Sequence, residues 1–236
     1  MYKILLAIAI VQLIIIFTDG IFTLKKMAKL QKDNGELHLC VKMFFSFSMV
    51  IIAFLLWRNN FTIIRNYSFF IFIGMLFSAL GDMIMAKVIK FKSRLIAAMA
   101  SFSIAHIFYI TAYIKAIIDL QLDFKFLLYI LIGVYIITLV LFKKFIFNKN
   151  KSSILNKTAL IYSLIIGTMT ACAMNLVMNY GGGFIITLFG AVIFMLSDFL
   201  IGISEIKENG PKNQSIWVWF TYVIGQMCII YTFIFL

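Results

Sequence analysis

Apolar runs of about 20 residues recur along the whole chain and are separated by short polar segments. A helix needs about 20 apolar residues to cross a hydrocarbon core of about 30 Å. The pattern therefore predicts membrane-spanning helices at residues 2–24, 39–57, 68–86, 95–118, 126–142, 158–178, 183–203 and 216–236. Because the loops are too short to hold a soluble domain, we expect an all-α fold, a polytopic transmembrane helical bundle of eight spans.

The composition agrees with one membrane domain. Hydrophobic residues make up 64% of the chain and charged residues only 13%, which is typical of integral membrane proteins. The single proline, Pro211, lies in the last loop, and no linker divides the chain, so residues 1–236 are expected to form a single transmembrane domain. The first apolar run is too long for a signal peptide and should stay attached. Cys40, Cys172 and Cys228 are widely spaced and are expected to be buried small hydrophobes.

The net charge is +12, and the positions of the basic residues along the chain argue for a membrane and against a nucleic-acid partner. Most basic residues fall in the loops after odd-numbered spans: Lys25, Lys26, Lys29, Lys32, Lys87, Lys90, Lys92, Arg94, Lys143, Lys144, Lys149, Lys151, Lys157, Lys207 and Lys212. By the positive-inside rule these loops are cytoplasmic and both termini are on the non-cytoplasmic side. The basic face would also attract anionic lipid headgroups.

The ionisable residues inside the predicted spans that call for an explanation are Asp19, Lys42, Asp82, His106 and Asp198. Such groups cost about 2.5–3.5 kcal/mol each on insertion scales and are functional by default. Counted from the charged loops that follow them, Asp82 and Asp198 both lie roughly 8–10 Å inside the cytoplasmic boundary. Asp19 is predicted near the same level, and Lys42 is shallow.

Further polar groups lie on the inner faces of the fourth and eighth spans. His106 is predicted near mid-membrane, with Tyr109 and Tyr113 on its face of the helix. Tyr222 and Gln226 share a face of the last span by their i, i+4 spacing. All of these groups are expected to converge on one cavity in the inner half of the bundle.

The surroundings of the two aspartates also resemble each other. ALGDMIMA around Asp82 and MLSDFLIG around Asp198 follow one pattern, and the next polar landmarks, His106 and Tyr222, follow at equal distances. This spacing is compatible with a parallel repeat of four spans plus four, in which the third and seventh spans correspond.

Two carboxyl groups held close together in an apolar interior do not both ionise cheaply, so one keeps its proton while the other carries a charge. Asp82 and Asp198 would thus supply an acid and a base at neutral pH. In the alternative interpretation each aspartate only packs helices through hydrogen bonds to serine, tyrosine or backbone groups.

Other polar residues also keep two interpretations. Asp19 can serve the same cavity or simply pair with Lys42. His106 can shuttle protons, bind substrate or be a satisfied core histidine, and with no cysteine or glutamate nearby in sequence it does not predict a zinc site. Two roles are open for a further set of residues, which can line the cavity or form hydrogen bonds between helices: Tyr109, Tyr222 and Gln226.

A resemblance follows from the series Gly81-Asp82, Ala105-His106 with Tyr109, Ser197-Asp198, and Tyr222 with Gln226. On a basic chain of eight spans, this series resembles the YhhN-type lysoplasmalogenase family of integral membrane proteins, from about Lys42 to Gln226. One departure is visible, because the family commonly has Lys-Pro in its second span and here Met43 follows Lys42. The local kink and the headgroup role of Lys42 are therefore open.

The resemblance implies hydrolysis of the vinyl ether bond of lysoplasmalogens (lysoplasmenylethanolamine or -choline). The products would be a fatty aldehyde and glycerophosphoethanolamine or glycerophosphocholine, and no metal or organic cofactor would be needed. Asp82 and Asp198 would be the catalytic acid and base. Substrate or water would be positioned by His106, Tyr109, Tyr222 and Gln226, and Lys42 and Asp19 would be accessory residues near the headgroup. The partner is then a membrane lipid in the bilayer.

Two rival functions remain open. An intramembrane aspartyl-type peptidase also uses two aspartates, although its GxGD motif reads Ala79-Leu80-Gly81-Asp82 here. A proton-coupled transporter would use the carboxyls and His106 as a relay, but no span contains the proline that often interrupts transporter helices. The bias toward Lys, Ile, Phe and Asn suggests an AT-rich genome and so a bacterial inner membrane, whereas the oligomeric state has no signal in the sequence.

Overall fold

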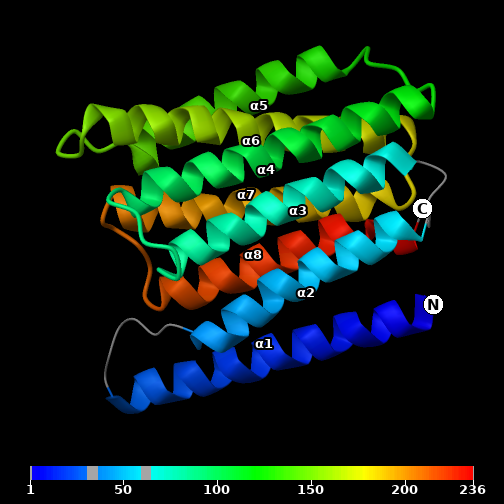
Figure 1. Cartoon of the computed structure of the whole chain (residues 1–236). Helices are drawn as coiled ribbons and strands as arrows, with labels where there is room; N and C mark the ends of the chain where they lie inside the picture. The colour runs from blue at the N-terminus through cyan, green and yellow to red at the C-terminus, as the bar shows by residue number, and fades with distance from the viewer. Residues whose placement is uncertain (1, 31–36, 60–64, 236) are drawn as a thin grey trace.

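The computed structural model describes residues 2–30, 37–59 and 65–235, and in this part of the chain the regular structure is all helical. The α-helices are α1 (Tyr2–Leu30), α2 (Leu39–Arg58), α3 (Arg65–Met85), α4 (Arg94–Asp119), α5 (Leu127–Leu141), α6 (Ser153–Asn179), α7 (Phe184–Ile201) and α8 (Gln214–Tyr231) (Figure 1). Short π-helical turns, η1 (Phe142–Ile146) and η2 (Gly202–Ile206), continue α5 and α7, and a 3-10 turn, η3 (Thr232–Ile234), follows α8.

Among the described residues, eight helices are long and apolar enough to cross a membrane, which confirms the predicted spans. Both chain ends lie at one end of the bundle, and the α3–α4, α5–α6 and α7–α8 connections lie at the other (Figure 1). These connections carry the basic clusters, so this end is the one that the charge pattern assigns to the cytoplasm. That assignment stays a prediction, and Lys32 and Leu236 lie outside the described residues.

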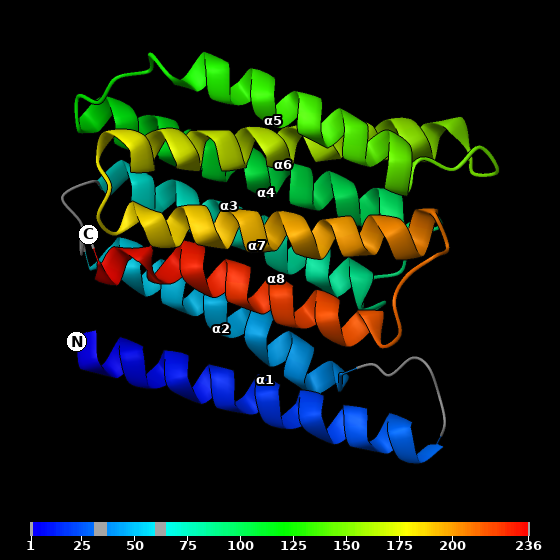
Figure 2. The ribbon, with the colours of Figure 1, turned by 180° about the vertical axis from the view of Figure 1, so that it is seen from behind.

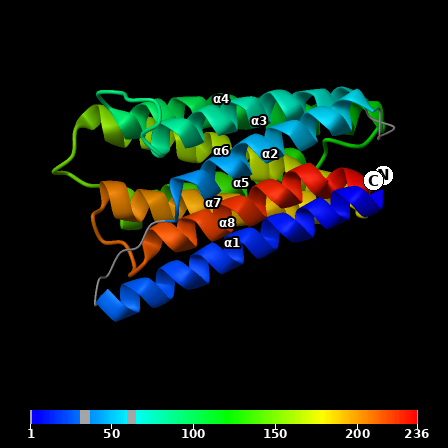
Figure 3. The same cartoon turned by 60° about the horizontal axis from the view of Figure 1, so that its bottom comes forward.

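Two tight helix pairs form the centre of the bundle. α3 packs mainly on α4, and α7 mainly on α8; α6 packs on α4, and α2 packs on α3 (Figures 1 and 2). The outer helices are α5, none of whose residues is buried, and α1, which lies along α2 and α8 at the edge (Figure 3). Gln12 ties α1 to this edge, because its amide donates to Ser48 Oγ at 2.7 Å and accepts from Tyr231 Oη at 2.9 Å.

Glycines allow the central helices to approach closely. A Cβ added at Gly190 of α7 would lie 2.8 Å from the carbonyl oxygen of Gly225 on α8, and one at Gly225 would lie 3.0 Å from that of Gly190. In α3, a Cβ at Gly74 would lie 2.4 Å from the ring of Tyr109 on α4. Small residues at such crossings let membrane helices gain van der Waals contact that the hydrophobic effect does not supply between them.

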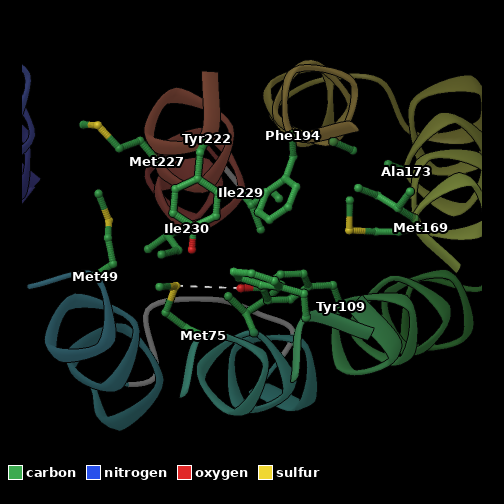
Figure 4. Packing of buried hydrophobic residues seen from close by; sticks show 14 of the residues in the cluster. Met49, Met75, Tyr109, Met169, Ala173, Phe194, Tyr222, Met227, Ile229 and Ile230 are labelled. Carbon is green, nitrogen blue, oxygen red and sulfur yellow. Dashed lines mark hydrogen bonds between the residues drawn. The ribbon is translucent and has the colours of Figure 1, made fainter. Parts of the chain in front are cut away.

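Aromatic rings and methionines fill the interior. In the close view, the side chains of Tyr109, Phe194 and Tyr222 meet between α4, α7 and α8, and Met75 lies beside Tyr109 (Figure 4). The Tyr109 hydroxyl lies 3.7 Å from Met75 Sδ. This packing joins the two central helix pairs and sets the positions of the polar groups described below.

The cysteines are free in this structure, as expected for a chain without a disulfide framework. Cys172 is buried and Cys228 is half-buried. Cys40, however, is exposed, so the prediction that it is buried was wrong. The reason is its position in the first turn of α2, at the end of the bundle that carries the basic loops, where few helices surround it.

Candidate active site around Asp82 and Asp198

Asp82 lies near the end of α3 and is almost completely buried, with 3% of its surface exposed. Its Oδ2 atom accepts hydrogen bonds from Ser46 Oγ of α2 at 2.6 Å and from Tyr222 Oη of α8 at 2.8 Å. Three helices therefore meet at one carboxyl oxygen. Two polar partners offset much of the cost of placing this group in an apolar interior.

The hydrogen bonds continue from Asp82 toward mid-membrane. Gln226 Nε2 donates to Tyr222 Oη at 3.3 Å, and Tyr109 Oη donates to Gln226 Oε1 at 3.2 Å. Ser78 Oγ lies 3.2 Å from Tyr109 Oη at the far end. Residues Ser46, Ser78, Asp82, Tyr109, Tyr222 and Gln226 form what we call the Asp82 network. It includes three of the four residues predicted to position substrate or water.

Asp198 lies in the last turn of α7, and its side chain is 9% exposed. Tyr162 of α6 donates a hydrogen bond to Asp198 Oδ2 and also lies 3.2 Å from His106 Nε2. His106 Nε2 is 3.9 Å from the same carboxyl oxygen. Residues His106, Tyr162 and Asp198 form the Asp198 network. His106 is fully buried, and among the described residues its Nδ1 has no hydrogen-bond partner.

The two networks lie against each other across one aromatic ring. Phe194 has its ring centroid 4.8 Å from that of His106. It lies 5.1 Å from that of Tyr222, and these two rings are seen side by side in Figure 4. Through these rings the surroundings of Asp82 and Asp198 form one continuous apolar interior, in which interactions between charges are stronger than in water.

The contacts of the two aspartates are related by the spacing seen in the sequence. Positions 82 and 198, 106 and 222, and 46 and 162 all differ by 116 residues. Ser46 donates to Asp82 across 36 residues, and Tyr162 donates to Asp198 across 36 residues. Each aspartate also lies beside a group from the other half of the chain, Tyr222 and His106 respectively. These equivalences support the parallel repeat of four spans plus four.

Three hollows adjoin one another toward the end of the bundle that carries the basic loops. A polar vestibule of about 390 Å³ includes Lys42, Lys87 and Arg94 in its lining. An inner cavity of about 40 Å³ lies behind Met85 and Ile201, which line both. This inner cavity has room for a few water molecules only.

The third hollow is an apolar groove of about 380 Å³. The groove and the inner cavity share Ile146, Tyr162, Ser163 and Asp198 as lining residues. Asp198 therefore stands where a water-sized space meets an apolar one. Asp82 is not in the lining of these three hollows, and Phe102, which lines the inner cavity, packs against the Tyr222 ring at 6.1 Å.

The two accessory residues are separated from each other. Lys42 is buried and lies beside the vestibule, with its ammonium 5.5 Å from the centre of the Trp219 ring. Asp19 lies on the peripheral helix α1, where its carboxylate binds the backbone N–H of His38 at 3.1 Å and the imidazole Nδ1 of His38 at 2.6 Å. The structure thus brings Lys42 to the site and leaves Asp19 outside both networks.

Two residues that hydrogen-bond directly to the aspartates, Ser46 and Tyr162, were not predicted from the sequence. Both are uncharged, and an uncharged hydroxyl in an apolar span is too common to stand out as a charged group does. The repeat held the signal, because Ser46 and Tyr162 occupy equivalent positions 36 residues before the two aspartates.

A metal centre has no support from the part of the chain that the structure describes, where no three His, Cys, Asp or Glu side chains are grouped as metal ligands. Comparison with known families is decisive. The model of the YhhN family matches residues 37–233, which is most of the chain. The protein belongs to the YhhN family. The match begins just before α2, so α1 precedes the part shared with the family. No curated protein and no solved structure matches the chain.

Proposed function

We propose that this YhhN-family protein hydrolyses the vinyl ether bond of lysoplasmalogens. The products are a fatty aldehyde and glycerophosphoethanolamine or glycerophosphocholine. The family membership and the series of motifs support this choice. The observation that carries it is the position of Asp198, at the junction of a water-sized cavity and an apolar groove within the membrane. A lipid whose scissile bond joins a polar glycerol to a hydrocarbon chain has the same arrangement of polar and apolar parts.

The reaction needs a proton donor first and a base second. Asp198, protonated, transfers its proton to the β-carbon of the vinyl ether, and the π electrons form the new C–H bond, which leaves an oxocarbenium ion. Asp82, ionised and nearby, stabilises this cation. Water from the inner cavity adds to the cationic carbon and gives its proton to the Asp198 carboxylate. The hemiacetal then collapses to aldehyde and alcohol, so one water molecule is consumed and the acid is restored. Glycosidases use two carboxyl groups against a similar oxocarbenium-like transition state.

The hydrogen-bond partners give the remaining residues their proposed roles. Tyr162 positions the Asp198 carboxyl and links it to His106. Tyr222 positions Asp82, and Gln226 and Tyr109 hold Tyr222 in turn. All these residues act on the reacting atoms through the two carboxyl groups.

The vestibule would receive the phosphate of the headgroup. Lys42 and Lys87 contribute positive charge to its lining, and Arg94 is held there by an ion pair in which its Nη2 atom donates to both carboxylate oxygens of Glu205, at 2.9 and 3.0 Å. Because this pairing uses only one guanidinium nitrogen, Arg94 keeps N–H groups with which it can bind a phosphate.

The test is aldehyde release from lysoplasmenylethanolamine by purified protein, with wild type compared with Asp82→Asn and Asp198→Asn. We expect each variant to lose activity by about 10²-fold or more, because general acid–base catalysis contributes about 10²–10⁴-fold. Asp119→Asn is the matched control, because Asp119 ends α4 at the opposite end of the bundle and should leave the rate unchanged. Melting curves of all variants verify folding.

Full activity in either variant of the pair, or none in the wild type, would contradict the proposed reaction. The rival functions are then tested with the same preparations. Proton-coupled uptake in proteoliposomes without lipid turnover would indicate the transporter, and cleavage of a membrane peptide would indicate the peptidase.

A further inference from the structure

The apolar groove runs along α6 between α5 and α7. Both flanking helices pack on α6 and lie on either side of it (Figure 2). The groove is lined by residues of all three helices. Its walls are aliphatic over most of their length, with Val134, Ile137, Leu141, Ile166, Val192 and Leu196 among the lining residues. Away from the end at Asp198, a hollow of this composition favours hydrocarbon and offers few groups to a polar ligand.

One end of the groove lies against the π-helical turn η1, whose Phe142 and Ile146 line it. η1 and η2 pack against each other, and Ile146 of η1 lines both the groove and the inner cavity. Hydrogen bonds hold this end together, because Asn148 Nδ2 donates to the Ile206 carbonyl at 2.8 Å and Lys207 Nζ donates to the Phe147 carbonyl at 3.1 Å. Insertion of a single π turn is often found at functional sites.

The groove therefore begins at the polar groups of the site. Tyr162, Ser163 and Asp198 line this end, and from there the groove follows α6 as far as Thr170, about 12 Å toward mid-membrane at 1.5 Å per residue. Its side is open to the membrane, since Val192 is 41% exposed and Leu196 is 43% exposed. A chain lying in the groove could enter from the bilayer without crossing water.

We propose that this groove binds the single hydrocarbon chain of the lipid substrate, with its first carbons against Asp198 and its end near Val192. The inference rests on the proposed function for the identity of the reaction, whereas the binding of the chain is a separate property of the groove. Because the groove ends at mid-membrane, its length sets how long a hydrocarbon chain can be and still pack along its whole length against the groove walls.

The test uses Val192→Trp, which places an indole at the far end of the groove. The control is Ile185→Trp on the same helix, where Ile185 is 56% exposed and does not line the groove. The ligands are saturated alkyl-ether lysophospholipids with long and medium chains, which lack the vinyl double bond. Their binding to the intact protein is measured by displacement of a fluorescent lysolipid, and aldehyde release from the matching vinyl ethers is measured in parallel.

We expect Val192→Trp to weaken binding of the long chain relative to the medium chain by roughly threefold or more, with no change in Ile185→Trp. Lost van der Waals packing supplies this difference, because a chain displaced from the groove returns to lipid and not to water. The same shift in kcat/KM for the vinyl ethers would support both proposals. A shift in binding without any aldehyde release would keep the groove and overturn the hydrolysis. An unchanged ratio of the two affinities in Val192→Trp would overturn the groove, whether or not aldehyde is released.

Discussion

At the scale of single residues, the two aspartates are held differently. Asp82 accepts two hydroxyl groups and is sealed among helices α2, α3 and α8, whereas Asp198 has Tyr162 as its hydrogen-bond donor and lines two hollows. Equivalent positions in the repeat have thus diverged: serine at 46 stands where tyrosine stands at 162. The larger side chain reaches both Asp198 and His106, which suits the carboxyl that we propose as the proton donor.

Removal of the Tyr162 hydroxyl should therefore impair catalysis more than folding. We expect Tyr162→Phe to lower kcat by about 10- to 100-fold with little change in KM, because Asp198 loses the group that orients it. Tyr135→Phe is the control, since it also loses one hydrogen bond, to Thr168 at 2.7 Å, on helices that flank the groove. Steady-state kinetics and melting curves of the two variants make the comparison. Equal and small losses of kcat in both would contradict a positioning role for Tyr162.

At the scale of helices, the site depends on how closely α7 and α8 cross. Gly190 and Gly225 bring the backbones together about one turn from Phe194 and Tyr222, the two rings that meet where the networks adjoin. Helix association in a membrane depends on such packing, since lipid tails are as apolar as the helix surface. A methyl group at this crossing must push two helices apart, because the atoms that it meets are backbone atoms and, at Gly190, also the Cβ of Cys228, which is fixed to the backbone of α8.

We expect Gly190→Ala to destabilise the protein by about 1–3 kcal/mol, the usual cost of overpacking a well-filled interior. Gly133→Ala in α5 is the matched control, because an added Cβ there has no neighbour within 4 Å. Because alanine is more favourable than glycine inside a helix, Gly133→Ala should leave the free energy of unfolding unchanged or slightly higher. Melting temperatures in detergent measure both effects, and equal stability of the two variants would contradict the close crossing.

At the scale of the whole molecule, the polar groups of the candidate site lie toward one end of the helical bundle, and closely packed aromatic rings lie toward the other. The vestibule, the inner cavity and both aspartates lie toward the basic loops. Toward the termini, Tyr67 packs against Tyr113, Phe184 and Phe233, with ring centroids 5.1–6.0 Å apart. The substrate would therefore be taken from the leaflet on the basic side.

The charge pattern predicts that this side is the cytoplasm. In a bacterial host, alkaline phosphatase fused after Leu236 should be active, and the same enzyme fused after Asn150, in the α5–α6 connection, should be inactive. Green fluorescent protein at the two positions should give the opposite pattern, because it fluoresces only in the cytoplasm. The reverse result at both positions would place the vestibule and the lysines on the outside.

Hydropathy by itself determined the eight spans and the all-helical fold, since a bilayer demands about 20 apolar residues per helix and leaves few alternatives. The cost of charge in hydrocarbon likewise singled out Asp82, Asp198 and Lys42 from the sequence alone. Only the tertiary structure decided that Asp19 pairs with His38 and that Ser46 and Tyr162 hold the carboxyls. It also decided that Asp198, and not Asp82, faces the hollows. Helical periodicity tells which residues share a face, but the neighbour of that face depends on which helices pack together and at what rotation.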